Sequence, residues 1–212
     1  MTGELSFRTD EAWPRVSRET RERLDIFLDL FAQWSGKTNL VAASTRRDVV
    51  HRHIGDSLQL LRLVPEPSKW VDLGSGAGFP GLILAIAWAD TSGAWVDLVE
   101  SNRKKAAFLR AVVAATGAAA SVHPDRIEAV YDKIPVRDRI ASRALADLDQ
   151  LLSLSEPWFR SNPTCEAWFH KGRDYRREID EARGRWQFDL VEHPSAIEPD
   201  SVILQIANLK SM

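Results

Sequence analysis

In Val71-Asp72-Leu73-Gly74-Ser75-Gly76-Ala77-Gly78, an apolar strand pattern runs directly into closely spaced glycines. Because glycine has no Cβ, the backbone at these positions can adopt left-handed dihedrals and approach a ligand closely. A helical pattern follows over residues 81–88. A glycine loop between a strand and a helix is typical of cofactor sites in α/β proteins. The stretch therefore predicts an α/β fold with a cofactor loop at the carboxyl end of a strand.

On the C-terminal side of this loop, short apolar runs alternate with helical patterns. The expected strands are 70–73, 94–99, 119–123, 139–142, 167–170, 188–191 and 202–206, and the expected helices are 81–88, 102–116, 147–159 and 175–186. This alternation predicts a mostly parallel, Rossmann-like sheet with helices on both faces. The last two strands have no clear helix between them, so we expect them to form a hairpin at one edge of the sheet.

On the N-terminal side, the chain divides at Val64-Pro65-Glu66-Pro67-Ser68, a proline-containing connector. Before it lies a helical pattern over 17–34 with one apolar face. A second pattern opens at Thr45, where Thr45 and Asp48 are expected to cap a helix. We therefore expect residues 1–64 to form an N-terminal helical extension, packed as one compact unit on a domain formed by residues 65–212.

Composition excludes several classes of protein. The 212 residues are 44% hydrophobic and carry a net charge of −2, which argues against coating of nucleic acid through bulk charge. The sequence contains no apolar run long enough for a membrane span and no signal peptide. Its single cysteine, Cys165, cannot form an internal disulfide or a thiolate zinc cluster. We therefore expect a cytoplasmic protein with no metal site and no membrane contact.

Basic residues nevertheless cluster locally, and these clusters supply the candidates for contact with nucleic acid. The candidates are Arg52, Arg103, Lys104, Lys171 and Arg173. A charge cluster of this kind is also typical of an ordinary solvated surface with acidic residues nearby.

Two cofactors compete for the glycine loop. Gly76, Gly78 and Gly81 fit the G-x-G-x-x-G pattern of dinucleotide binding, which would make the protein a nicotinamide-dependent oxidoreductase. Asp72, two residues before the first glycine, is expected near the middle of the cofactor, where it would repel a pyrophosphate. S-adenosylmethionine instead carries a cationic sulfonium and an ammonium group. The carboxylate therefore favours S-adenosylmethionine, with the dinucleotide as the alternative.

Three further positions are expected around that cofactor. Glu100 ends the second strand, where a carboxylate can bind ribose hydroxyls. Asp125-Arg126-Ile127-Glu128 follows the third strand and is placed to enclose an adenine. Arg143 follows the fourth strand, near the sulfonium end, with a salt bridge to Asp147 or another carboxylate as its alternative role.

Motifs that are absent from the sequence narrow the choice of the atom that accepts the methyl group. Attack by a pyrimidine carbon needs a cysteine nucleophile, but Cys165 lies at the start of a late strand. Amine acceptors commonly use an Asn- or Asp-Pro-Pro-aromatic loop, which is replaced here by Ala141-Ser142-Arg143-Ala144. A guanine N7 already presents a lone pair and needs no base, so positioning alone can supply the catalysis. The pattern is consistent with N7 as the acceptor.

An ordered set of motifs extends this reading. The set comprises Trp34 with Asn39-Leu40, Arg52-His53-Ile54-Gly55-Asp56-Ser57, the glycine loop through Phe79-Pro80-Gly81, Leu98-Val99-Glu100, Arg103-Lys104-Lys105, Phe108-Leu109, Arg126-Ile127-Glu128, Ser142-Arg143-Ala144 and Lys171-Gly172. With these motifs the chain resembles the RsmG family, also called GidB, the bacterial 16S ribosomal RNA guanine-N7 methyltransferases. The resemblance spans roughly residues 27–171.

The resemblance implies a class I S-adenosylmethionine-dependent methyltransferase acting on guanine 527 in the 530 loop of 16S ribosomal RNA, within the small ribosomal subunit or its precursor. The cofactor contacts it implies are Gly74, Phe79, Ile127, Glu128 and Arg143, with Glu100 as the ribose partner. It places Arg52, His53 and Asp56 beside the active site, although His53 is equally expected as a packed histidine between helices. It assigns no certain catalytic base, and we expect a monomer.

Two features depart from the family. His170 stands where an aliphatic residue usually precedes Lys-Gly, and Glu198-Pro199-Asp200-Ser201 lacks the basic residue that commonly precedes the last strand. Both departures bear on RNA contacts more than on chemistry. They leave open a third interpretation, a non-catalytic RNA-binding protein of ribosome assembly.

Overall fold

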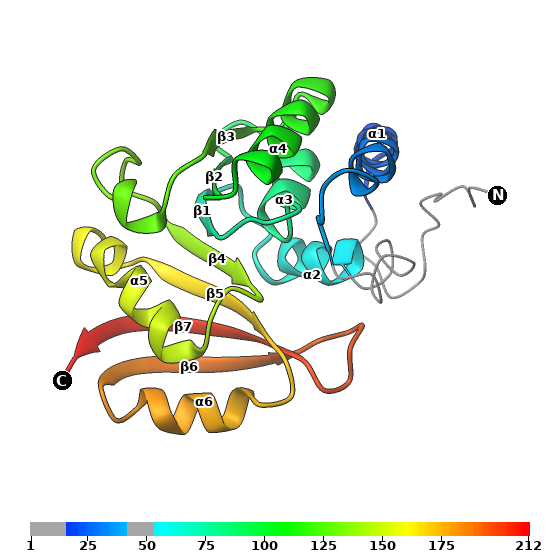
Figure 1. Ribbon diagram of the computed structural model, residues 1–212. Coiled ribbons are helices and arrows are strands. Elements are labelled where there is room, and N and C mark those ends of the chain that lie inside the picture. Colours follow the sequence, from blue (N-terminus) through cyan, green and yellow to red (C-terminus); the bar gives the residue numbers. More distant parts are fainter. Residues whose placement is uncertain (1–15, 42–52) are drawn as a thin grey trace.

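The computed structural model describes residues 16–41 and 53–212, and the chain in these ranges folds as an α/β protein (Figure 1). The strands are β1 (Lys69–Leu73), β2 (Trp95–Val99), β3 (Ala120–His123), β4 (Arg139–Arg143), β5 (Glu166–Lys171), β6 (Trp186–Pro194) and β7 (Val202–Ser211). The helices are α1 (Arg18–Ser35), α2 (Asp56–Leu63), α3 (Gly81–Ala87), α4 (Arg103–Thr116), the short 3-10 helix η3 (Ile127–Ala129), α5 (Leu148–Ser161) and α6 (Tyr175–Ala182). None of the helices in these ranges is long and apolar enough to cross a membrane.

The strands of the described ranges form one sheet in the order β3-β2-β1-β4-β5-β7-β6. The first five strands are parallel, and β7 pairs antiparallel with both β5 and β6. From β1 the chain moves outward to β2 and β3, and it then returns to place β4 on the other side of β1. The loops after β1 and β4 therefore diverge, which opens a crevice at the carboxyl ends of these strands.

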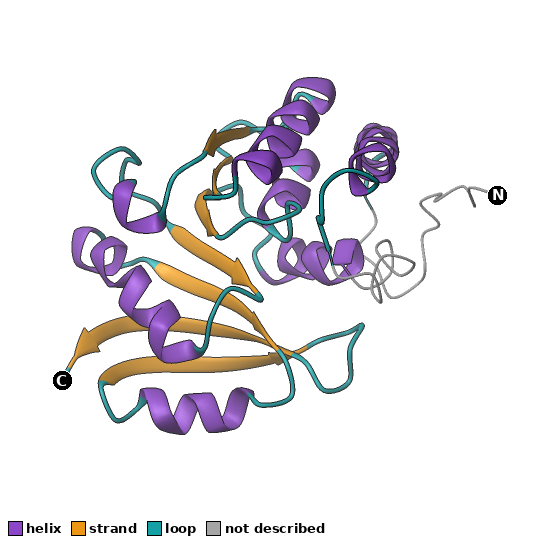
Figure 2. Cartoon of the chain, in the orientation of Figure 1, coloured by secondary structure: helices purple, strands orange, loops and turns teal. Residues whose placement is uncertain are grey.

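Helices cover both faces of the sheet, as predicted (Figure 2). On one face, α1, α3 and α4 pack together around Phe27, Phe31 and Phe108, whose ring centroids lie 5.9–6.3 Å apart. On the other face, α5 and α6 share an apolar cluster with β5, β6 and β7. Because buried residues of α1, α2, α3 and α4 belong to one cluster, the core continues across the connector at residues 64–68.

The predicted elements are confirmed, with two corrections at the C-terminal end. The predicted hairpin forms, but both of its strands are longer than expected, because β6 and β7 pair from Trp186 with Ser211 to Pro194 with Val202. The predicted helix 175–186 ends at Ala182, and Trp186 instead begins β6. Long-range strand pairing thus overrides the local helical pattern. The predicted helix start at Thr45 and Asp48 lies outside the described residues.

Candidate cofactor site

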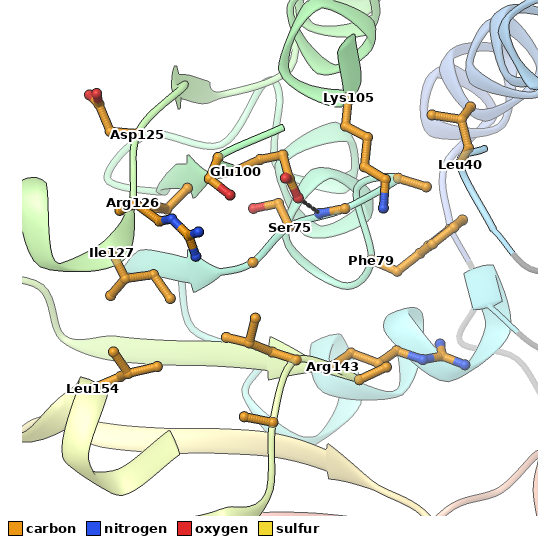
Figure 3. A pocket seen from close by; sticks show the side chains of 18 of the residues that line it. Leu40, Ser75, Phe79, Glu100, Lys105, Asp125, Arg126, Ile127, Arg143 and Leu154 are labelled. Atoms are coloured by element: carbon orange, nitrogen blue, oxygen red, sulfur yellow. Dashed lines mark hydrogen bonds between the residues drawn. The ribbon is translucent and has the colours of Figure 1, made fainter. Parts of the chain in front are cut away.

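A cavity of about 490 Å³ opens at the carboxyl ends of β1, β2 and β4 (Figure 3). Its wall is formed by the glycine loop after β1, the segment after β3, and residues 143–146 after β4. Seven of the nine residues predicted to bind the cofactor line it, namely Gly74, Gly76, Phe79, Glu100, Ile127, Glu128 and Arg143. Of the other two, Asp72 lies beneath the loop, and Gly78 belongs to the loop but does not line the cavity.

The loop after β1 needs glycine for conformational reasons. Gly74, Gly76 and Gly78 have φ angles of +69°, +57° and +99°, which L side chains rarely adopt. A Cβ on Gly74 would also approach a Leu145 methyl carbon to 2.7 Å. The backbone of the loop can therefore form the cavity wall directly, with Leu145 packed against it.

Asp72 lies below this loop and does not line the cavity. It is fully buried, and its Oδ2 accepts a hydrogen bond of 3.2 Å from the N–H of Gly81, the first residue of α3. A Cβ on Gly81 would come within 2.5 Å of the carboxylate, so the third glycine of the pattern serves close strand–helix packing. Burial raises the pKa of Asp72 to about 7. The structure thus places the carboxylate where it supports the loop, and not on the wall expected to face a cofactor.

Glu100 ties the loop to β2. One of its carboxylate oxygens accepts a hydrogen bond of 2.8 Å from the backbone N–H of Gly76 (Figure 3). The other accepts one of 2.7 Å from the N–H of Asn102. A carboxylate offers about four lone pairs, so these two bonds leave acceptor capacity on the cavity side. Glu100 can therefore hold the loop and still accept hydrogen bonds from a pair of ribose hydroxyls.

The end of the cavity near β3 combines the charged residues Asp125, Arg126 and Glu128 with an apolar wall. Val99, Ile127 and Leu154 form this wall, and Ile127 belongs to η3. The chain on either side of η3 is anchored by a buried ionic cluster. In that cluster Asp97 accepts from Arg137 Nε at 2.6 Å and contacts His123 Nε2 at 2.7 Å. The segment predicted to enclose an adenine therefore lies between two anchored residues, His123 and Arg137.

Arg143 lies at the opposite end, beside α2. Its Nη1 is 3.3 Å from Asp56 Oδ2, and it makes a long contact of 3.5 Å with the carbonyl oxygen of His53. Asp56 is therefore the carboxylate that pairs with Arg143, whereas Asp147 caps α5 through the N–H of Gln150. The His53 ring stacks on Phe79, with centroids 5.0 Å apart, so two predicted site residues from distant motifs form one wall.

The predicted RNA-binding residues differ in their surroundings. Arg103 and Lys104 are exposed at the start of α4, and Arg173 is exposed after β5. The side chain of Lys171 is instead only 8% exposed, with its Nζ 2.5 Å from Glu178 and 2.8 Å from the carbonyl of Ala146. Lys171 therefore anchors the segment after β4. Arg52 lies outside the described residues.

Lys105 lines the cavity, although it was predicted only as part of the motif Arg103-Lys104-Lys105 and not as a site residue. Its side chain extends from α4 into the cavity toward Phe79 (Figure 3). The helical spacing indicates that Lys105 faces inward, because Phe108, Leu109 and Val112 follow it at i+3, i+4 and i+7 and are all buried. Leu40, which also lines the cavity, follows α1 and reaches it only through tertiary packing.

Several solved structures have a similar fold. The ribosomal protein L11 methylase from Lactobacillus delbrueckii subsp. bulgaricus superposes with a TM-score of 0.56 at 19% identity, over 74% of this chain and 79% of that one. Cofactor-bound Rv0187 from MTB gives a TM-score of 0.61 at 11% identity, over 88% and 90% of the two chains. These likenesses concern the fold. The fold is that of the class I S-adenosylmethionine-dependent methyltransferases, with the glycine loop and Glu100 lining its cavity.

The chain belongs to the GidB family, rRNA small subunit methyltransferase G, whose family model matches residues 20–201. Ribosomal RNA small subunit methyltransferase G of Rhizobium johnstonii is 56% identical over 198 residues, which cover 93% of this chain and 97% of the relative. The Rhizobium meliloti protein of the same name is 57% identical over 196 residues, which cover 92% of each chain. The family predicted from the motifs is thereby confirmed, and with it a methyltransferase in place of an oxidoreductase.

Proposed function

We propose that this protein transfers a methyl group from S-adenosylmethionine to N7 of a guanine in 16S ribosomal RNA. The observation that carries the proposal is that one cavity contains the glycine loop with Glu100 together with Lys105 and Arg143, two of the three cationic residues that line it. The first pair suits an adenosine-bearing cofactor, and the cations suit an RNA acceptor. The names of the relatives, which refer to small-subunit ribosomal RNA, support the same substrate.

The residues present fit the cofactor along the length of the cavity. Val99 and Ile127 offer apolar surface to an adenine, Glu100 offers acceptors to ribose hydroxyls, and the loop around Gly74 gives backbone contact to the methionine part. When bound, the cofactor supplies a methyl group made electrophilic by the adjacent sulfonium. The chain itself then has to hold the acceptor in line and exclude water.

The acceptor side calls for orientation and no general base. Guanine N7 has its lone pair exposed at neutral pH, so a side chain that grips both O6 and N7 would block the reaction. We assign Lys105 and Arg143 to contacts with guanine O6, a phosphate or the cofactor carboxylate. Arg103 and Lys104, exposed at the start of the same helix as Lys105, are positioned to take neighbouring phosphates.

In the finer assignment, the methylated base is guanine 527 in the 530 loop, within the small ribosomal subunit or its precursor. The protein acts as a monomer in the cytoplasm. The position comes from the resemblance between the motifs of this chain and those of the family. The test uses small subunits purified from a strain that lacks this protein, labelled cofactor and the purified enzyme. We expect label at one N7-methylguanine, located by mass mapping of RNA fragments.

Calorimetry with S-adenosylmethionine and NADH is the matching control for the cofactor. Binding of the first and not the second is expected. The protein could instead bind ribosomal RNA but transfer no methyl group to naked RNA, to the small subunit or to its precursor. In that case it is an assembly factor and the proposal is wrong. Label at another nucleotide would keep the chemistry and overturn the position.

A further inference from the structure

Asp56, at the start of α2, joins separate parts of the chain around one buried carboxylate. Its Oδ2 lies 3.3 Å from Arg143 Nη1, and its Oδ1 accepts a hydrogen bond of 3.0 Å from Ser195 Oγ. His170 Nε2 lies 3.2 Å from its main-chain oxygen and 3.9 Å from Oδ2. β4, β5 and the loop between β6 and β7 therefore meet at one residue of α2.

His170 lies next to Arg143 in the sheet, since the two residues are register partners on β5 and β4. Its side chain is buried, and burial lowers its pKa against the smaller raising effect of Asp56. The partner of Nε2 is a carbonyl oxygen, which can only accept, so Nε2 must carry the proton. The neutral ring thus donates a hydrogen bond to the first residue of α2.

The loop between β6 and β7 holds the same end of α2. Gln59, three residues after Asp56 and on the same face of the helix, donates to the Pro194 carbonyl at 2.8 Å and accepts from the Ala196 N–H at 2.9 Å. Between these bonds Ser195 donates to Asp56. Since the carboxylate of Asp56 faces Arg143, these contacts limit where the guanidinium can lie at the cavity.

We propose that His170 and Ser195 are positioning residues for methyl transfer, which hold Asp56 and, through Asp56, the guanidinium of Arg143 at the acceptor end of the cavity. The proposal rests on the proposed function, which assigns Arg143 to the site. It gives His170, the residue that departs from the family pattern, a defined task. It also connects the loop that precedes β7 to the chemistry, although that loop does not line the cavity.

The test is a double-mutant cycle on methyl transfer to small subunits. His170→Leu replaces the buried imidazole by an apolar side chain and removes the donor, and we expect kcat to fall about tenfold, the effect of losing one such hydrogen bond. His170→Gln retains an N–H donor and is expected to recover most of the rate. In the Arg143→Lys background, His170→Leu is expected to cost less than about twofold more, because the two residues act through one another.

The matched control is His193→Leu. His193 is another histidine of the same sheet, less buried than His170, and its ring stacks on Trp168 and bonds to Gln205. Its substitution is expected to leave kcat within about twofold. Ser195→Ala is the second arm and is expected to lower kcat in the same direction as His170→Leu. Equal losses from His170→Leu with and without Arg143, or no recovery in His170→Gln, would overturn the proposal.

A second measurement separates this proposal from the proposed function. Side-chain ¹⁵N NMR of Arg143, assigned with Arg143→Lys, follows rotation of the guanidinium without any methyl acceptor. Faster rotation in His170→Leu and Ser195→Ala is expected. If the wild-type protein transfers no methyl group but this faster rotation is seen, the proposed function is wrong and the positioning role stands. Unchanged rotation in both variants would overturn the positioning role.

Discussion

The backbone N–H of Gly76 donates a 2.8 Å hydrogen bond to the carboxylate of Glu100, so the loop after β1 and the end of β2 form one rigid corner of the cavity. The second oxygen of Glu100 accepts from the N–H of Asn102, whose own side chain caps α4. The start of α4, which carries Lys105 into the cavity, is thereby tied to the same carboxylate. A single side chain thus couples the expected cofactor wall to the expected RNA side.

Glu100→Gln tests this corner. The amide has one acceptor oxygen and one NH₂ donor, so one of the two N–H groups now at Glu100 would face another donor. A hydrogen bond to a charged group contributes about 1.5–3 kcal/mol, so we expect affinity for S-adenosylmethionine to fall roughly 10- to 100-fold in calorimetry. The control is Glu156→Gln, which changes a surface ion pair with Arg160 on α5. This variant should bind the cofactor like the wild type. Wild-type affinity in Glu100→Gln would contradict the assignment.

Gly74→Ala tests the loop conformation. Its φ is +69°, and the added Cβ would meet Leu145 at 2.7 Å. Gly93 provides the control, because its φ is +89° and nothing lies within 4 Å of an added Cβ. Both substitutions are expected to lower the free energy of unfolding by about 1–2 kcal/mol in urea denaturation. Only Gly74→Ala is expected to weaken cofactor binding, and equal binding losses in the two variants would refute a specific role for the loop.

Asp72 predicts a pH dependence of stability. Burial raises its pKa from 3.8 to about 7 in the folded chain, so between these values the folded state keeps a proton that the unfolded state has lost. By linkage, this group makes the free energy of unfolding decrease as pH rises from about 4 to about 7, by up to ~1.4 kcal/mol per pH unit.

Asp72→Asn removes that titration and keeps an acceptor for the Gly81 N–H. Urea denaturation of both proteins across this pH range is therefore expected to show the variant gaining stability relative to the wild type as pH rises. Parallel pH profiles for the two proteins would show that Asp72 titrates normally in the folded state.

The buried pair of Asp97 and Arg137 is expected to matter for stability. Both side chains are under 10% exposed, and Arg137→Met would leave Asp97 with His123 alone. Loss of one member of a buried ion pair costs about 3–5 kcal/mol, measured as the free energy of unfolding. Arg160→Met breaks an exposed i,i+4 pair with Glu156 and should cost less than about 1 kcal/mol. Similar costs for the two variants would contradict the burial argument.

Local pattern was sufficient for most of the fold. The strand before Gly74 and the helix after Gly81 could be predicted locally. Burial of a strand requires a run of apolar residues, and the positive φ angles of a loop favour glycine. The predicted helix 175–186 was wrong at its end, because Trp186 satisfies its backbone by pairing with Ser211, a residue 25 positions away in sequence. No local periodicity carries that information.

The glycine loop, the succession of strands along the chain and the acidic residue at the end of β2 were determined by the sequence alone, because each depends on conformational preferences and burial of adjacent residues. Tertiary structure alone decided which charges meet. It placed the side chain of Lys171 against Glu178, Asp72 beneath the loop and Arg143 beside Asp56, 87 residues away in the sequence. Electrostatic partners depend on distance in space and on exclusion of water, and neither is encoded in the spacing of residues along the chain.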